Sequence, residues 1–160
     1  MSLEDAQSDL WYASRDGPIS EVKSLLNDYP NILRGSQALT AACLKGQTQI
    51  LKLLLERGAD PYVRGNFGQL AIHRAAENGQ TECIRILLEY VGPSAAQQMI
   101  HLGDGMGQQP LHFAAEEGHY DCCVYLLKQG ADKYAKYRGK TPQLWALRGG
   151  HMDCAKLLEI

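Results

Sequence analysis

The sequence predicts an all-α solenoid, in which helix-turn-helix units stack side by side and are joined by short β-hairpin fingers. Three observations favour this class: glycines that recur in pairs, a spacing near 33 residues between the pairs, and double leucines between one pair and the next. A unit of this size cannot bury its apolar face alone, so each unit must pack against its neighbours. The 160 residues are therefore expected to form one continuous domain.

The glycine pairs define the repeat. The first glycine of each pair lies at Gly35, Gly68, Gly107 and Gly139, and the second lies eleven positions later at Gly46, Gly79, Gly118 and Gly150. The intervening residues are SQALTAACLK, QLAIHRAAEN, QQPLHFAAEE and KTPQLWALRG. An eroded copy ends at Gly17. The expected repeats are about 4–32, 33–65, 66–102, 103–135 and 136–160.

Each unit is expected to contain a finger, an inner helix and an outer helix, in that order. Thr141-Pro142 suits the start of an inner helix, because Thr can cap free amides and Pro lacks an amide there. Small residues such as Ala75 and Ala76 keep the inner helix slim, and the second glycine suits the turn that follows it. The outer helices carry Leu25-Leu26, Leu54-Leu55, Leu87-Leu88, Leu126-Leu127 and Leu157-Leu158.

These landmarks, together with Gly-Ala-Asp at 58–60 and 130–132, resemble the ankyrin repeat family. The resemblance covers about residues 8–160 and implies about five repeats, the N-terminal one degenerate. It implies a non-catalytic protein–protein interaction module that acts as an adaptor, an inhibitor or an assembly factor. Two departures are Tyr62 and Tyr134, which stand where the family usually has Asn to brace the finger. These rings either pack between fingers or face a partner.

The step from Gly68 to Gly107 is six residues longer than the usual spacing, and the segment 91–102 carries the insert. Ser94 could cap a short additional helix there, and a lengthened loop is the alternative. Inserted segments often carry binding contacts, so this one is a candidate site.

Composition and charge exclude several function classes. The net charge of −2 gives no reason to expect nucleic acid as a partner, and no apolar run is long enough to span a membrane. Five cysteines, an odd number without a CxxC pair, indicate reduced thiols, which in repeat register are small core residues of the helices. We therefore expect the chain in the cytoplasm or the nucleus.

No motif indicates catalysis, a metal or a cofactor. His73 and His112 occupy the His position of the TPLH-like motif, where the resemblance implies a hydrogen bond to backbone between repeats. Glu116 and Glu117 end an inner helix and are expected to be solvated. Phe113 and Trp145 are expected to pack in the core.

The resemblance implies that a partner contacts the finger tips and the exposed ends of the inner helices, which together form a concave groove. These positions are Arg34, Arg64, Asn66, Phe67, Gln69, Glu77, Asn78, Met106, Gln108, Glu116, Glu117, Tyr137, Arg138, Lys140 and Arg148. Phe67 and Met106 are expected to be apolar anchors, with Tyr137 extending the row, and Glu77, Glu116 and Glu117 to form an acidic patch. The expected partner segment carries an apolar or aromatic residue flanked by Lys or Arg.

Two alternatives remain open for the whole protein. The chain could be a targeting or regulatory segment of a larger enzyme or channel, or a pathogen effector with the same fold. A monomer is the expected oligomeric state.

Overall fold

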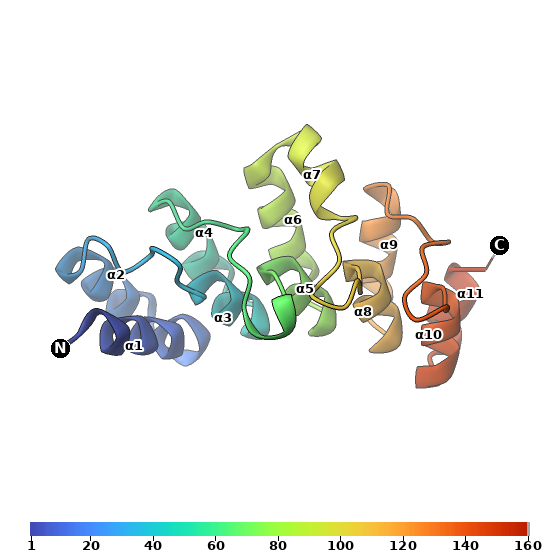
Figure 1. Ribbon diagram of the computed structural model, residues 1–160, viewed down its shortest axis with the longest axis horizontal. Helices are drawn as coiled ribbons and strands as arrows, with labels where there is room; N and C mark the ends of the chain where they lie inside the picture. The colour runs from blue at the N-terminus through green and yellow to red at the C-terminus, as the bar shows by residue number, and fades with distance from the viewer. Residues whose placement is uncertain (160) are drawn as a thin grey trace.

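The computed structural model describes residues 1–159, so the last expected repeat is described up to Glu159 and Ile160 lies outside the described residues. Five helix pairs follow one another along the long axis, with the two ends of the chain at opposite ends of the row (Figure 1). The pairs are α1 (Leu3–Asp16) with α2 (Ile19–Asp28), α3 (Ala38–Lys45) with α4 (Thr48–Glu56), α5 (Ala71–Glu77) with α6 (Thr81–Val91), α8 (Pro110–Glu116) with α9 (Tyr120–Lys128), and α10 (Pro142–Gly149) with α11 (Met152–Leu157).

The helices pack in two rows. The inner helices α1, α3, α5, α8 and α10 contact one another in sequence, and the outer helices α2, α4, α6, α9 and α11 do the same. Between the rows lies one continuous apolar core, in which the side chains of Leu10, Leu54, Leu87 and Leu126 are fully buried. This arrangement confirms the all-α class, because leucine pairs at helical spacing place one face of every outer helix in the core.

The turn between inner and outer helix requires glycine for two reasons. Gly79 and Gly118 both have positive φ angles, of 70° and 75°, which L-residues rarely adopt. A Cβ at Gly79 would lie 2.7 Å from Nδ1 of His119, and one at Gly118 would lie 2.3 Å from the same atom of His151. The histidine of each following repeat therefore lies directly against the turn before it.

The fingers are tight turns, and the β-hairpins expected from the sequence are not confirmed. One main-chain hydrogen bond closes the base of each of two fingers, from Gly65 N to Gln69 O at 2.8 Å and from Asp104 N to Gln108 O at 2.9 Å. In residues 1–159 the only β-bridge is an isolated one between Tyr137 and Lys140. A longer ladder cannot form, because the chain enters the next inner helix immediately after the finger closes.

The inserted segment forms a helix, α7 (Pro93–Met99), so the helical alternative is correct and the loop alternative is wrong. The expected cap is wrong: Gly92 precedes the helix and Pro93 takes its first position, which leaves Ser94 already inside it. Thr141 likewise makes no side-chain capping bond, although Pro142 does begin α10 as expected.

Two buried histidines hydrogen-bond backbone through both ring nitrogens, as expected, but every partner lies within the expected bounds of the histidine's own repeat, 66–102 or 103–135, so a bond between repeats is not shown. In His73, Nδ1 accepts a hydrogen bond from Leu70 N at 2.9 Å, and Nε2 donates to Leu102 O at 2.8 Å. His112 repeats this with Gln109 N at 3.2 Å and Ala135 O at 3.0 Å. Because a backbone N–H can only donate, both Nδ1 atoms must be unprotonated. Burial lowers the pKa of each imidazole below its usual range.

All five cysteines are free and buried, which agrees with their expected place in the core. Burial raises the pKa of the Cys123 and Cys154 thiols, since a thiolate is poorly solvated between packed helices. Phe113 and Trp145 are also buried, 6% and 3% exposed, as expected. Within residues 1–159, none of the helices has the length and apolar character needed to cross a bilayer.

Candidate protein-interaction surface

The predicted contact residues divide into three groups by exposure. Nine side chains are exposed: Arg34, Arg64, Asn66, Phe67, Met106, Glu117, Arg138, Lys140 and Arg148. Glu77, Asn78 and Glu116 are partly buried, and Gln69, Gln108 and Tyr137 are buried. The exposed group lies on the fingers and at the ends of inner helices, where the sequence placed it.

Phe67 is the most exposed large apolar residue of the chain that lies on a finger. Its side chain is 75% exposed, and its backbone has a φ angle of 58°, in the left-handed region. Left-handed backbone costs an L-residue roughly 1–2 kcal/mol. The next finger fixes this conformation, because Gly105 N donates a hydrogen bond of 2.9 Å to Phe67 O. Strain held at an exposed position is typical of functional sites.

Arg64 braces the same pair of fingers. Its Nη1 donates to Gly68 O at 2.7 Å and to Gly103 O at 3.1 Å, so one guanidinium joins the base of one finger to the next. Met106, which is 54% exposed, then stands beside the last finger, with its sulfur 4.0 Å from the Tyr137 hydroxyl. The three fingers therefore form one connected row.

Tyr137 does not extend the apolar row as expected. Its side chain is only 7% exposed, because its ring stacks on Trp145 with centroids 5.3 Å apart. The aromatic pair forms part of the support beneath the last finger. The sequence places Tyr137 at a finger position, but it does not show that the indole of Trp145, in the following helix, packs against the tyrosine ring.

Gln69 and Gln108 are also buried, so the expectation that they face a partner is wrong for most of their side chains. Both directly follow the first glycine of their repeat, Gly68 or Gly107. The amide of Gln108 donates a hydrogen bond of 2.9 Å to Glu116 Oε2, which connects the finger to the end of α8.

The acidic patch is smaller than expected. Glu77 forms an ion pair with Arg74 at 2.9 Å, which neutralises its charge. Glu116 accepts the Gln108 hydrogen bond, and Glu117 is exposed. The uncompensated negative charge of this region therefore lies on Glu116 and Glu117 at the end of α8.

The two finger tyrosines that replace Asn are exposed, Tyr62 by 41% and Tyr134 by 53%, so neither packs between fingers. Aspartates take over the bracing: Asp60 Oδ1 accepts from Tyr62 N, and Asp132 Oδ1 accepts from Tyr134 N, both at 2.8 Å. A short side-chain acceptor two residues earlier stabilises such a turn without the family's Asn.

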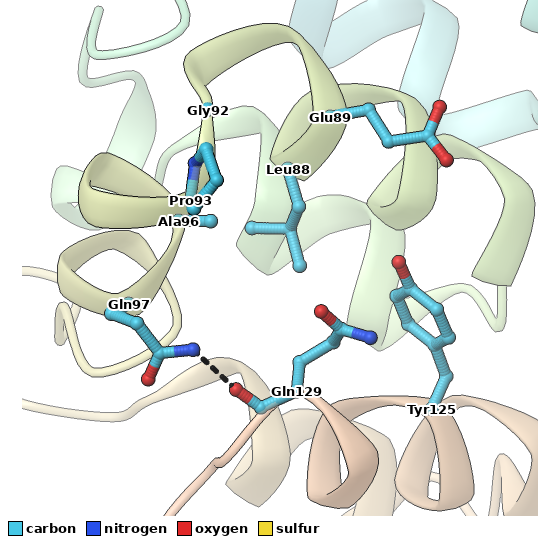
Figure 2. A pocket seen from close by; sticks show the side chains of 8 residues that line it. All are labelled: Leu88, Glu89, Gly92, Pro93, Ala96, Gln97, Tyr125 and Gln129. Atoms are coloured by element: carbon cyan, nitrogen blue, oxygen red, sulfur yellow. Dashed lines mark hydrogen bonds between the residues drawn. The ribbon is translucent and has the colours of Figure 1, made fainter.

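Sequence reasoning did not locate a pocket on the outer side, between α7, α6 and α9. It has a volume of about 430 Å³, and Leu88, Pro93, Ala96 and Tyr125 provide its apolar walls (Figure 2). Gln97 crosses its rim and donates a hydrogen bond of 2.7 Å to Gln129 O (Figure 2). The only signal for this pocket in the sequence was the inserted segment 91–102. The repeat pattern did not show which helices that segment would pack against.

The fold and the row of fingers define a class of protein, the helical repeat solenoids, which bind through an extended surface. A sequence model described as ankyrin repeats (3 copies) matches residues 10–98, 61–137 and 92–159, which together span nearly the whole chain. The protein belongs to the ankyrin repeat family. Repeats of this family are a general protein-interaction module and are typically non-catalytic.

Similar curated proteins are diverse. A probable E3 ubiquitin-protein ligase of Oryza sativa subsp. japonica, XBOS33, is 39% identical over 48% of this chain and 16% of its own length. The human transient receptor potential cation channel subfamily A member 1 is 31% identical over 42% of this chain and 6% of its own. Mouse protein phosphatase 1 regulatory subunit 12A is 36% identical over 40% of this chain and 6% of its own length. The chain thus matches a small part of each relative.

Proposed function

We propose that this chain is a non-catalytic adaptor, inhibitor or assembly factor that binds a segment of another protein across its finger row. Phe67 and Met106 are the apolar anchors, and Glu116 and Glu117 select Lys or Arg beside the residue that the anchors hold. The observation that carries this proposal is the exposed, left-handed Phe67, fixed by the backbone of the next finger. An interface gains most of its free energy from a few such anchors, and charges at its rim set the register.

Two further features support the proposal. The row is rigid, because Arg64 and the hydrogen bond between Gly105 and Phe67 join adjacent fingers, so little order has to be gained on binding. The matched relatives include a phosphatase regulatory subunit and a probable ubiquitin ligase. Such names fit a binding segment that serves unrelated machinery, and fold alone does not choose among them.

The test is affinity capture from the native cell with quantification by mass spectrometry. The variant Phe67→Ala/Glu117→Lys should recover at least tenfold less of the partner than the wild type does. A matched control, Tyr90→Ala/Glu56→Lys, makes the same two kinds of change on the exposed outer helices α6 and α4 and should recover the wild-type amount. If the wild type and the Phe67→Ala/Glu117→Lys variant recovered equal amounts of the partner, the partner would not bind at this surface and the proposal would be refuted.

The same binding role also suits a targeting or regulatory segment of a larger enzyme or channel. The similarity to parts of a ubiquitin ligase and of a cation channel favours this second arrangement. The mature length of the native protein, measured by immunoblot, distinguishes them: a product much larger than 17.7 kDa supports the segment. The buried free thiols fit a reducing compartment, and we place the chain in the cytoplasm or the nucleus.

A further inference from the structure

The positive charge of this chain is concentrated near one end. Residues 128–148 contain six Lys or Arg and a single Asp, whereas the rest of the chain contains ten Lys or Arg and seventeen Asp or Glu. A net charge of −2 conceals this polarity. The last finger and α10 therefore form a basic surface beside an otherwise acidic molecule.

Three of these cations surround the stacked pair Tyr137 and Trp145. The Arg138 guanidinium lies 5.4 Å from the centre of the Tyr137 ring. The Lys140 ammonium and the Arg148 guanidinium lie 5.6 Å and 5.0 Å from the centre of the Trp145 ring. We call Arg138, Lys140 and Arg148 the cation cluster. An aromatic face attracts a cation without neutralising it, so the rings hold these groups in place while their charge stays available.

The cluster also lacks acidic partners. The ion pairs among residues 1–159 join Arg15 to Asp16, Arg74 to Glu77, and Arg85 to Glu82 and Glu89. None of them includes a member of the cation cluster, and all three members are exposed. Like charges held close together repel each other, and an anion from outside the chain relieves that repulsion.

The backbone at this position is strained as well. Arg138 has a φ angle of 49°, and Phe67 is the only other described residue besides glycine with a positive φ. Both stand directly before the glycine of their finger tip. A turn of this kind favours Asn, Asp or Gly at that position, and neither Phe nor Arg is selected by the turn itself. The backbone turn alone therefore does not account for an arginine at this tip.

The cluster is continuous with the proposed binding surface. Met106 lies between them, with its sulfur 3.9 Å from Arg138 Nη2 and its backbone in the finger next to Phe67. A segment that lies across Phe67 and Met106 reaches the cation cluster if it continues towards the C-terminal repeat.

From these observations we infer that the cation cluster binds an acidic stretch of the partner segment, rich in Asp or Glu. The partner segment therefore carries opposite charges at its two ends, with basic residues opposite Glu116 and Glu117 and acidic residues opposite the cation cluster. This inference rests on the proposed function for the course of the segment. Charge complementarity argues against nucleic acid, because a polyphosphate chain that extended from the cluster along the fingers would meet Glu116 and Glu117.

A peptide titration tests the cluster directly. The ¹⁵N-labelled full chain is titrated with end-blocked hexaglutamate, and the indole resonance of Trp145 is followed. That N–H donates to Tyr137 O at 3.2 Å beneath the cluster, whereas Trp11 lies in the first helix and is an internal reference. Hexaglutamate should shift the Trp145 resonance and leave Trp11 unchanged, and the affinity should fall as salt is raised.

Variants then assign the effect. Arg138→Glu/Lys140→Glu/Arg148→Glu should weaken hexaglutamate binding at least tenfold, and the corresponding Gln variants, which remove the positive charges without adding negative ones, at least threefold. The control Lys23→Glu/Lys52→Glu/Lys156→Glu changes the net charge equally on exposed outer-helix positions and should bind within twofold of the wild type. Circular dichroism checks that each variant is folded.

Three outcomes overturn the inference: no shift of Trp145 at millimolar hexaglutamate, equal weakening by the cluster and control variants, or tighter binding of a single-stranded hexanucleotide through the same three residues. Phe67→Ala separates this inference from the proposed function. Hexaglutamate binding should be unchanged in that variant, so a failed partner-capture experiment would leave the cluster standing.

Discussion

Acidification should destabilise this protein through His73 and His112. Each ring accepts a backbone N–H at Nδ1, and protonation of that atom would place two donors against each other. Burial also lowers both pKa values from the ordinary 6.5. The folded state therefore resists protonation, while the unfolded chain takes up a proton near its ordinary pKa. The stability that the two neutral histidines contribute is present above about pH 6.5 and is lost as the pH falls below that value.

Linkage gives the magnitude. Between pH 7.5 and 5.5, a histidine with an unfolded pKa of about 6.5 that stays neutral when folded lowers the free energy of unfolding by about 1.4 kcal/mol. Two such residues give about 2.8 kcal/mol, a limit reached when both folded pKa values lie below this window. The exposed carboxyl groups whose pKa is lowered, such as Glu82, titrate below this range and contribute little within it.

Urea denaturation followed by circular dichroism at both pH values measures the difference. His73→Gln or His112→Gln should retain about half of the wild-type pH dependence, and the double variant should retain little, whatever its absolute stability. His101→Gln, in the exposed end of the insert, should behave as the wild type does. A double variant that loses as much stability on acidification as the wild type would show that these rings are not the sensors.

Three further predictions concern the fingers and the core. Gly68→Ala should cost about 2 kcal/mol more than Gly35→Ala in urea denaturation, because both have a φ of 70° but only the Cβ at Gly68 meets backbone of the next finger, at 2.6 Å. Phe67→Asn and Arg138→Asn should each raise the free energy of unfolding by about 1 kcal/mol, since Asn tolerates left-handed backbone; lower melting temperatures would contradict the assigned strain. The five buried thiols should react with a disulfide reagent within seconds in denaturant and much more slowly in the native state; equal rates would contradict their burial.

The sequence predicted the helices and their stacking because these depend on repeated, local signals. Leucine pairs such as Leu87-Leu88 recur in register, and a turn glycine such as Gly79 satisfies a backbone need that no other residue meets as easily. The position of each histidine in the motif was informative for the same reason. Its bonds run to backbone, which every repeat supplies in the same place.

The sequence did not predict the fingers or the full set of exposed residues, because these depend on contacts between neighbouring repeats. Gln108 is buried because it finds Glu116, and Tyr137 is buried because it finds Trp145 eight residues later. The spacing of the glycines and leucines does not show that either side chain is buried. The choice between loop and helix for the insert also had no local answer, since Pro93 both begins the helix and displaces the expected cap at Ser94.

The two strained fingers connect stability to binding. Phe67 and Arg138 hold the same position before a finger glycine, and both keep a left-handed backbone that Asn would adopt more easily. One of them presents an exposed aromatic ring and the other an uncompensated cation, so the strain coincides with the two kinds of side chain that recognise a partner. Met106 also precedes a glycine with positive φ but has no positive φ itself, and its finger is held by Asp104, whose Oδ1 accepts hydrogen bonds from Met106 N and Gln108 N. The proposed partner, with an apolar or aromatic residue at one finger and an acidic stretch two fingers later, would account for both side chains at once.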